Sequence, residues 1–218
     1  MLAFVFVATQ PKRPQKTPRG EARRKAILQA AIPLLADNGY RGASLASIAA
    51  AADLTQQGVL HYFRSKEELL LALIQERDRQ DGKRLSALVT EEGLALLDVL
   101  EELVRHNQES REDVRLFSTL VAEGASVEHP AHDYFVERYQ RIRGRVLRSL
   151  REGQEVGEID PDVDLNALVP AIVGAMDGLQ IQWLLDPEID MSAGFEALMR
   201  LLRAQLRMGP EDGVDQST

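Results

Sequence analysis

Three helix-start signals follow one another within a short stretch of the chain, and their spacing constrains the fold more than any other feature. Ser44 and Thr55 are good N-caps, each placed before a short run that carries apolar residues at helical spacing. Asp53 lies between the two runs, and aspartate tolerates the left-handed backbone that a tight turn needs. Ser65 and Glu68 then form the S-x-x-E pattern that opens a longer helix. This order predicts a helix-turn-helix, whose second helix enters the major groove of DNA.

Three short sequences in this stretch are distinctive: Ser-x-x-x-Ile-Ala from Ser44, Ala-Asp-Leu-Thr from Ala52, and His-Tyr-Phe-Arg-Ser-Lys-Glu-Glu-Leu from His61. Together they resemble the DNA-binding signature of the TetR family of bacterial transcription regulators. Two positions depart from it. Asp53 stands where the family usually has a glycine in the turn, and Leu60 stands where it usually has a tyrosine, often directed at a phosphate. The resemblance implies an all-α regulator, most often a repressor, and we assign no phosphate contact to Leu60.

Charge is distributed unevenly along a chain whose formal net charge is −8. Residues 1–66 hold ten Lys and Arg against three Asp and Glu, which gives +7, so the remainder holds 16 against 31 and carries −15. A basic head on an acidic body is what a DNA-binding domain joined to a body that does not touch DNA would show. The alternative is a chance bias or a basic tail, since four of the ten bases precede Gly20.

Composition narrows the classes of protein further. The absence of cysteine excludes disulfides and thiolate chemistry and fits a reducing compartment, so we expect a cytoplasmic protein. Hydrophobic residues make up 44% of the chain, enough for a packed core, and we expect no membrane association. The apolar start of residues 1–8 precedes the basic residues, which is the reverse of the order in a signal peptide.

Helical periodicity continues through the rest of the chain. No segment shows sustained two-residue alternation, so we expect an all-α fold with about nine helices and no sheet. Gly39 is expected to end the first helix, and Ser192 is expected to cap the last. We divide the chain into a disordered basic arm (1–19), a three-helix helix-turn-helix DNA-binding domain (20–66), a larger helical ligand-binding and dimerisation domain (67–208) and an acidic tail (209–218). The arm could add phosphate or minor-groove contacts or act as a solubilising tail.

Side chains around the turn and along the second short helix are expected to contact DNA. Ser44 and Lys66 would contact phosphates beside the positive ends of two helices. Gln56, Gln57 and His61 would face the groove, where glutamine pairs with adenine through two hydrogen bonds. The whole predicted set is Arg41, Ser44, Thr55, Gln56, Gln57, Gly58, His61, Tyr62, Arg64 and Lys66.

Residues 164–186 form the most apolar of the expected helices. Small residues recur along it at three- and four-residue spacing, which lets another helix approach closely, and a helix apolar nearly all round must be buried. The segment from Ala175 to Leu184 also resembles the penultimate helix of many TetR-type regulators, which implies a homodimer through a four-helix bundle. A core helix of a monomer is the alternative. The predicted interface comprises Ala171, Gly174, Ala175, Gly178, Phe195, Leu198 and Leu202.

The body is also expected to bind a small molecule between its helices. Asp177 and Gln180 are polar groups in an apolar helix, and such groups need hydrogen-bond partners when they are buried. A ligand would supply partners, and so would protein groups or a dimer interface. The candidate lining is Phe117, Tyr139, Met176, Asp177, Gln180 and Trp183.

Catalytic and metal-binding patterns are missing from the sequence. His129 and His132 lie near acidic residues, but Pro130 between them breaks the helix, and their spacing matches no firm ligand motif. We therefore expect no catalytic residue, metal or cofactor, with a helical metal-binding or enzyme bundle as the competing hypothesis. The leading hypothesis is a sequence-specific transcription regulator released from a palindromic DNA operator by an unknown small molecule.

Overall fold

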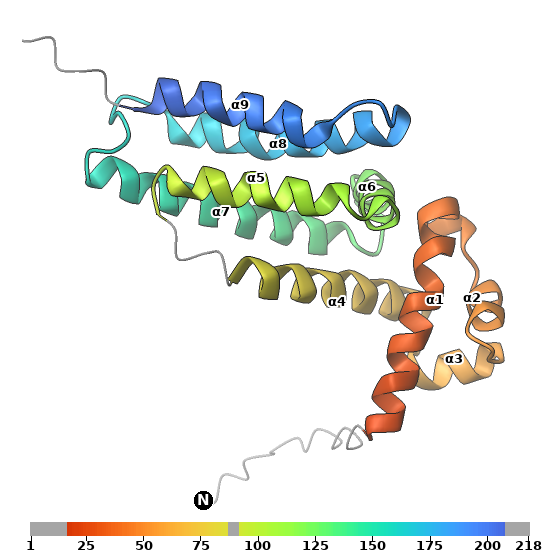
Figure 1. Cartoon of the computed structure of the whole chain (residues 1–218). Coiled ribbons are helices and arrows are strands. Elements are labelled where there is room, and N and C mark those ends of the chain that lie inside the picture. Colours follow the sequence, from red (N-terminus) through yellow and green to blue (C-terminus); the bar gives the residue numbers. More distant parts are fainter. Residues whose placement is uncertain (1–16, 87–91, 208–218) are drawn as a thin grey trace, which may run out of the picture.

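The computed structural model describes the backbone of residues 17–86 and 92–207 and the side chains of residues 17–79 and 92–207. Within these residues the regular elements are nine helices, as predicted, and they form a small head at one end of a larger helical body (Figure 1). The helices are α1 (Pro18–Gly42), α2 (Leu45–Ala51), α3 (Gln56–Tyr62), α4 (Lys66–Ser86), α5 (Ala95–Gln108), α6 (Arg111–Gly124), α7 (His132–Glu155), α8 (Leu165–Leu185) and α9 (Met191–Leu206).

The first helix begins earlier than predicted. Thr17 caps α1 by accepting a hydrogen bond from the Gly20 amide at 3.2 Å, and Pro18 occupies the first turn, where its missing N–H costs nothing. Pro18 and Arg19, which the prediction placed in the arm, therefore belong to α1. The rest of the predicted arm and the predicted acidic tail lie outside the described residues. Gly39 interrupts α1 with a φ of +65°, a left-handed value that glycine adopts without strain, as predicted for the helix end.

The local signals of the turn are confirmed. The Ser44 side chain accepts from the Ser47 amide at 3.0 Å, and the Thr55 side chain accepts from the Gly58 amide at 3.1 Å. Asp53 adopts a φ of +53° in the four-residue connection between α2 and α3, where the chain changes direction. Two short helices, both fixed at their N-termini, are thereby held at a defined angle to each other.

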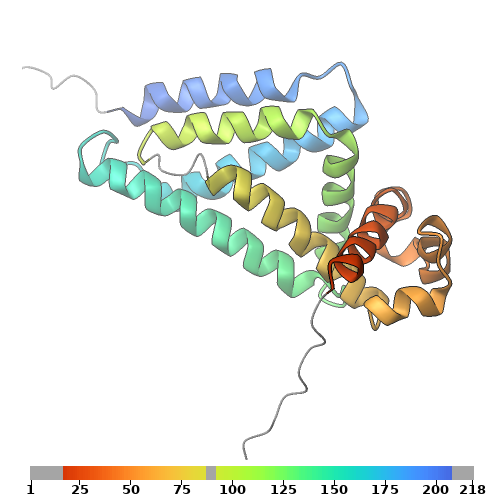
Figure 2. The ribbon, with the colours of Figure 1, turned by 60° about the horizontal axis from the view of Figure 1, so that its bottom comes forward.

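Helix α4 connects the head to the body. Ser65 opens it by accepting from the Glu68 amide at 3.1 Å. Figure 2 shows α4 lying between α5 and α7, and in Figure 1 helices α8 and α9 run side by side on the far side of α5 and α7. A movement of α4 against its neighbours in the body would therefore also move its head end.

Two hydrophobic clusters hold the molecule together. One joins all four N-terminal helices to α6 and the start of α7, with Ile27, Phe63 and Leu120 fully buried in it. The second joins α5, α7, α8 and α9 around Leu97, Leu150 and Phe195. Because the first cluster crosses the predicted boundary at residue 66, the head packs on the body through shared core side chains.

The last two helices show an N-cap that differs from the prediction, on α9, and an unusually apolar composition, on α8. The cap of α9 is Asp190, which accepts from the Ala193 amide at 3.0 Å, so the assignment of this role to Ser192 was wrong. By length and apolar composition alone, α8 would suffice to cross a membrane, although only 28% of the relevant window is buried within the chain. Its apolar character therefore needs a further explanation.

Candidate nucleic-acid interface and effector cavity

Helix α3 presents a polar face to solvent and an apolar face to the head. Val59 is fully buried, whereas Gln56, Gln57 and His61 are exposed. The predicted groove-facing side chains therefore lie together on the open side of the second helix of the helix-turn-helix. This is the position from which such a helix reaches base edges.

Gly58 lies within this polar face. A Cβ added at this position would meet Thr55 Oγ1 at 3.4 Å and Leu54 side-chain carbons at 3.5 Å, which are ordinary contact distances. The fold of the chain therefore does not require glycine here. Close approach of an external group, as predicted, would require it. Tyr62 is half-buried, and its ring meets that of His61 edge to face with 5.2 Å between centroids.

Positive groups surround the start of α2. Arg41 and Arg64 are exposed, and the capped N-terminus of α2 at Ser44 adds its dipole. Lys66 is more engaged than the sequence indicated. Its Nζ donates to the Ala43 carbonyl oxygen at 2.7 Å and lies 4.3 Å from the centroid of the Tyr40 ring. Lys66 thus fastens the start of α4 to the start of α2, in addition to any contact with phosphate.

The head is attached to the body at the break in α1. The Glu123 carboxylate on α6 accepts from the Tyr40 amide at 2.7 Å, and Arg115 on α6 pairs with Asp37 at 2.6 Å. A Cβ on Gly39 would lie 2.5 Å from Glu123 Oε1. Glycine is therefore favoured at position 39 by its positive φ, and a side chain there would displace the Glu123 carboxylate from the Tyr40 amide.

Two titratable groups of this junction have shifted pKa values. Burial, assisted by the hydrogen bond to Glu67, raises the pKa of Tyr40 to about 12. The buried His129 packs edge to face on Tyr40 with 5.2 Å between centroids, and desolvation lowers the pKa of its imidazole. Among the described residues, His129 Nε2 has no hydrogen-bond partner, and it lies 3.9 Å from a Glu123 oxygen. His129 is therefore a neutral packing residue near neutral pH.

A cavity of about 420 Å³ opens between α4, α5, α6, α7 and α8. Its volume is within the range of small-molecule sites, and most of its wall is apolar. Five of the six predicted lining residues border it, namely Phe117, Tyr139, Met176, Asp177 and Gln180.

The sixth predicted lining residue, Trp183, does not border this cavity. Its ring is buried in the core of the body, with the Arg111 guanidinium 5.1 Å from its centroid, and the Trp183 carbonyl accepts from Arg111 at 3.2 Å. Trp183 follows Gln180 by three positions and lies nearer the end of α8, where α6 covers it. The prediction failed because helical spacing fixes a face of the helix but not the depth at which a cavity ends.

The polar groups of the cavity wall are paired across helices. The Tyr139 hydroxyl donates to Asp177 Oδ2 at 2.7 Å, joining α7 to α8. Burial raises the pKa of Asp177 and also that of Tyr139, whose hydroxyl faces the carboxylate. Nearer α4, the Asp78 carboxylate accepts from the Tyr134 hydroxyl and from Arg138 Nε, the latter at 2.9 Å. Asp78 therefore fastens α4 to α7 at the edge of the cavity.

A stripe of small and apolar residues on α8 is open to solvent. A Cβ added at Gly174 or Gly178 would meet, within 4 Å, no described atom beyond its own stretch of helix. Ile181 and Leu185 continue the stripe at exposures of 50% and 81%. On α9, Leu201 is 65% exposed. Of the other predicted interface residues, Ala171 is exposed, whereas Ala175, Leu198 and Leu202 are half-buried.

Phe195 does not fit the predicted interface. Its side chain is fully buried in the chain's own second cluster, so a partner subunit cannot reach it. The helical periodicity of α9 distinguishes an apolar from a polar face, but both an intramolecular core and an intermolecular seam select apolar residues.

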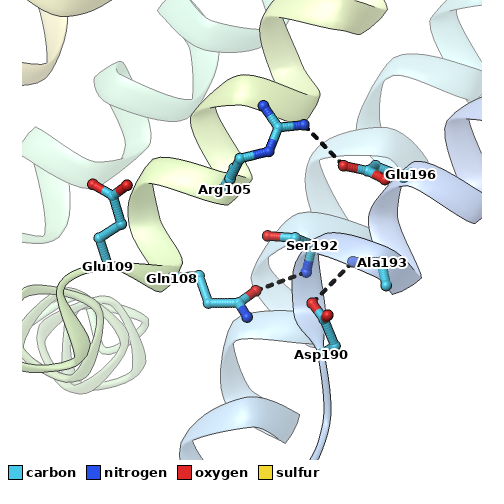
Figure 3. A pocket seen from close by; sticks show the side chains of 7 residues that line it. All are labelled: Arg105, Gln108, Glu109, Asp190, Ser192, Ala193 and Glu196. Carbon is cyan, nitrogen blue, oxygen red and sulfur yellow. Dashed lines mark hydrogen bonds and ion pairs between the residues drawn. The ribbon is translucent and has the colours of Figure 1, made fainter.

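A second hollow lies between α5 and the start of α9 (Figure 3). Its polar groups bind one another: Arg105 pairs with Glu196 at 2.8 Å, and the Gln108 side-chain oxygen accepts from the Ser192 amide at 2.9 Å (Figure 3). These contacts fasten α5 to α9. Among the described residues, no group of three or more His, Asp or Glu side chains is arranged as a metal site.

An exposed recognition helix on a basic head, attached to a helical body with an apolar cavity, defines the class of helical DNA-binding regulators with a sensory domain. Residues 27–73 match the family model of bacterial regulatory proteins of the tetR family, and residues 94–207 match that of the C-terminal domain of BetI-type transcriptional repressors. The chain therefore belongs to the TetR family and is a DNA-binding transcription regulator.

Individual relatives agree with this membership. The transcriptional regulator UidR of Escherichia coli K12 is 30% identical over 144 residues, which are 65% of this chain and 71% of UidR. Bacillus subtilis FadR, solved with stearoyl-CoA, has a TM-score of 0.68 at 20% identity over 84% of this chain and 99% of its own. SmeT, solved with triclosan, has a TM-score of 0.73 at 21% identity over 86% of this chain and 93% of its own. These two structures show a common fold.

Proposed function

We propose that the protein is a cytoplasmic homodimeric repressor that binds a palindromic operator and is released from it by a small molecule. The observation that carries this proposal is the exposed polar face of α3 on a basic head, whose residues 20–66 hold six Lys and Arg against three Asp and Glu, with Gln56, Gln57 and His61 side by side and open to solvent. Glutamine side chains on such a helix read adenine, and the surrounding bases bind phosphate without regard to sequence. The match to BetI-type repressors favours repression over activation.

The dimer follows from the unpartnered stripe on α8. Gly174, Gly178, Ile181 and Leu185 recur at i, i+4, i+7 and i+11, which places them on one face of the helix. A second copy of α8 and α9 would cover this face and complete a four-helix bundle. Two heads would then read two half-sites related by the same twofold axis, about 34–36 Å or a multiple apart.

The response to a ligand would act through α4. This helix forms one wall of the cavity and begins at Lys66, which is bound to the Ala43 carbonyl in the head. A ligand that favours a different position of α4 would change the separation of the two heads and thereby the fit to the operator. FadR and SmeT, solved with stearoyl-CoA and triclosan, support a body that accepts small molecules.

Selection of genomic DNA fragments by the purified protein, followed by mobility shifts on the enriched sequence, tests the proposal. Gln57→Ala is expected to weaken binding by about 1–3 kcal/mol and to relax the preference at one base position in each half-site. Gln140→Ala, which changes an exposed glutamine on α7, is the matched control. Equal binding of Gln57→Ala and the parent to the selected operator would contradict the assigned recognition surface.

A further inference from the structure

The wall of the cavity has a charge opposite to that of the body around it. Residues 67–218 carry −15, with 16 basic residues in all. Five of those 16 border this one cavity, against two acidic residues, so the described lining has a formal net charge of +3. The arginines are Arg77, Arg79, Arg138, Arg141 and Arg145, and the acidic residues are Asp78 and Asp177.

The charged and apolar parts of the wall are separated. Arg79, Arg141 and Arg145 are exposed, so they lie on the solvent side of the cavity. The apolar lining comes from α5, α6, α7 and α8, and most of it is buried: Leu96, Val99, Leu100, Phe117, Val146 and Ile172. A ligand that satisfies both parts has an elongated apolar body and one anionic end, because guanidinium groups pair with carboxylates and phosphates.

Arg138 lies where these two parts meet. Its guanidinium is 4.4 Å from the centroid of the Phe117 ring, and its Nε donates to Asp78 at 2.9 Å. The side chains of Arg138 and Asp78 are 18% and 21% exposed, so their ion pair is sheltered from solvent but accessible from the cavity. An ion pair in such a place is stronger than one on the surface, and a second anion can compete for it.

Asp177 has a partner of its own within the wall. Its carboxylate accepts from the Tyr139 hydroxyl at 2.7 Å, and desolvation raises its pKa. Asp78 is therefore the main anion that faces the arginines from within the described lining.

We propose that the effector is an anionic amphiphile, whose carboxylate or phosphate head group binds Arg138 in place of Asp78 while its apolar body fills the cavity. This inference rests on the proposed function, since it names the ligand class of the same cavity. Displacement breaks the Asp78–Arg138 pair, one of the two contacts through which Asp78 holds α4 to α7, and leaves only the bond from the Tyr134 hydroxyl. A head group that binds only after Asp78 has left has the differential affinity that a ligand needs to shift a conformational equilibrium.

Four probes that share a decyl chain test the charge of the head group: decanoate, decyl phosphate, 1-decanol and decyltrimethylammonium, each below its micellar concentration. Calorimetry on the full chain measures binding, and fluorescence anisotropy of labelled operator measures release. At least one anionic probe is expected to bind about 10- to 100-fold more tightly than decanol, as one charge-assisted contact allows, and to release the operator. The cationic probe is expected to bind more weakly than decanol.

Two variants test the role of the ion pair with effects of opposite sign. Arg138→Gln should remove the preference for the anion, whereas Asp78→Asn should strengthen anion binding, because the competing carboxylate is gone. General unfolding cannot strengthen binding, so the second variant separates the proposal from damage to the fold. Arg148→Gln removes an exposed arginine of α7 outside the cavity and should behave like the parent.

The inference would be overturned if decanol bound as tightly as both anionic probes. It would also be overturned if Arg138→Gln kept the parent's preference for anions. Failure of the parent to bind any selected operator would instead overturn the proposed function, and calorimetry would still report the charge preference of the cavity. If the parent binds the operator and none of the four probes changes that binding, the proposed DNA-binding function stands and only the inference is overturned.

Discussion

Around Gln57, the two faces of the seven-residue helix α3 have different roles: one face holds the helix in the fold, and the other is open to solvent. Val59 and the following Phe63 are fully buried and fix the helix to the head, while the glutamines make no contact that the fold needs. Substitutions on the exposed face should therefore change DNA binding with little effect on stability, and those on the buried face should do the reverse.

Gly58→Ala tests whether glycine serves the interface. Alanine fits the space available within the chain, and it favours a helix interior by about 0.5–1 kcal/mol over glycine. We expect an unchanged or higher urea midpoint together with about tenfold or greater loss of operator affinity, because the methyl group would occupy the space of closest approach. Unaltered affinity would show that DNA does not approach α3 at this position.

Substitutions of Asp53 test whether the left-handed backbone of the turn costs stability. The φ of +53° at Asp53 costs a side chain with a Cβ about 1–2 kcal/mol, a cost that aspartate reduces by local hydrogen bonding and that glycine avoids. We expect Asp53→Gly to be at least as stable as the parent and Asp53→Ala to be about 1 kcal/mol less stable, measured by chemical denaturation. If the alanine variant were as stable as the glycine variant, the strain argument would be wrong.

Among the elements, α6 has a role that the sequence did not predict: it contacts both the head and the cavity. It provides Glu123 and Arg115 to α1 in the head and Phe117 to the cavity, so one helix contacts the head on one side and the effector site on the other. Together with α4, it connects the cavity to the head through packed side chains.

His129 gives this junction a dependence on pH. Because desolvation depresses its pKa in the folded state, its stabilising contribution is present above its ordinary pKa of 6.5 and is lost as the pH falls through the lower folded value. The free energy of unfolding should therefore decrease between about pH 7.5 and about pH 5.5. His129→Gln should show a smaller decrease, while His61→Gln, which changes an exposed histidine, should follow the parent. Equal slopes for all three proteins would contradict this account.

For the whole molecule, the decisive surface is the exposed face of α8 and α9. Its exposed apolar side chains are Ile181 and Leu185 on α8 and Leu201 on α9, and only 28% of the most apolar window of α8 is buried within one chain. A second copy would bury what one copy leaves open.

Leu185→Glu and Leu201→Glu should each shift the protein from dimer to monomer in light scattering, because a seam that buries an unpaired carboxylate loses several kcal/mol. Val127→Glu is the matched control, since Val127 is 71% exposed and lies in the connection between α6 and α7. Dimers in both α8 and α9 variants would place the interface elsewhere, and loss of the dimer in the control would point to a general effect of charge.

The sequence by itself determined the features whose physics is local. Caps at Ser44 and Thr55, the left-handed residue at Asp53 and the periodicity of nine helices depend on contacts within a few residues. Both the fold class and the exposed polar face of α3 could therefore be predicted. The tertiary structure alone decided what depends on distant partners. It placed Trp183 and Phe195 in the core, bound Lys66 to the Ala43 carbonyl, and brought Asp78 and Arg138 together at a cavity, because helical periodicity does not specify which neighbour covers a face.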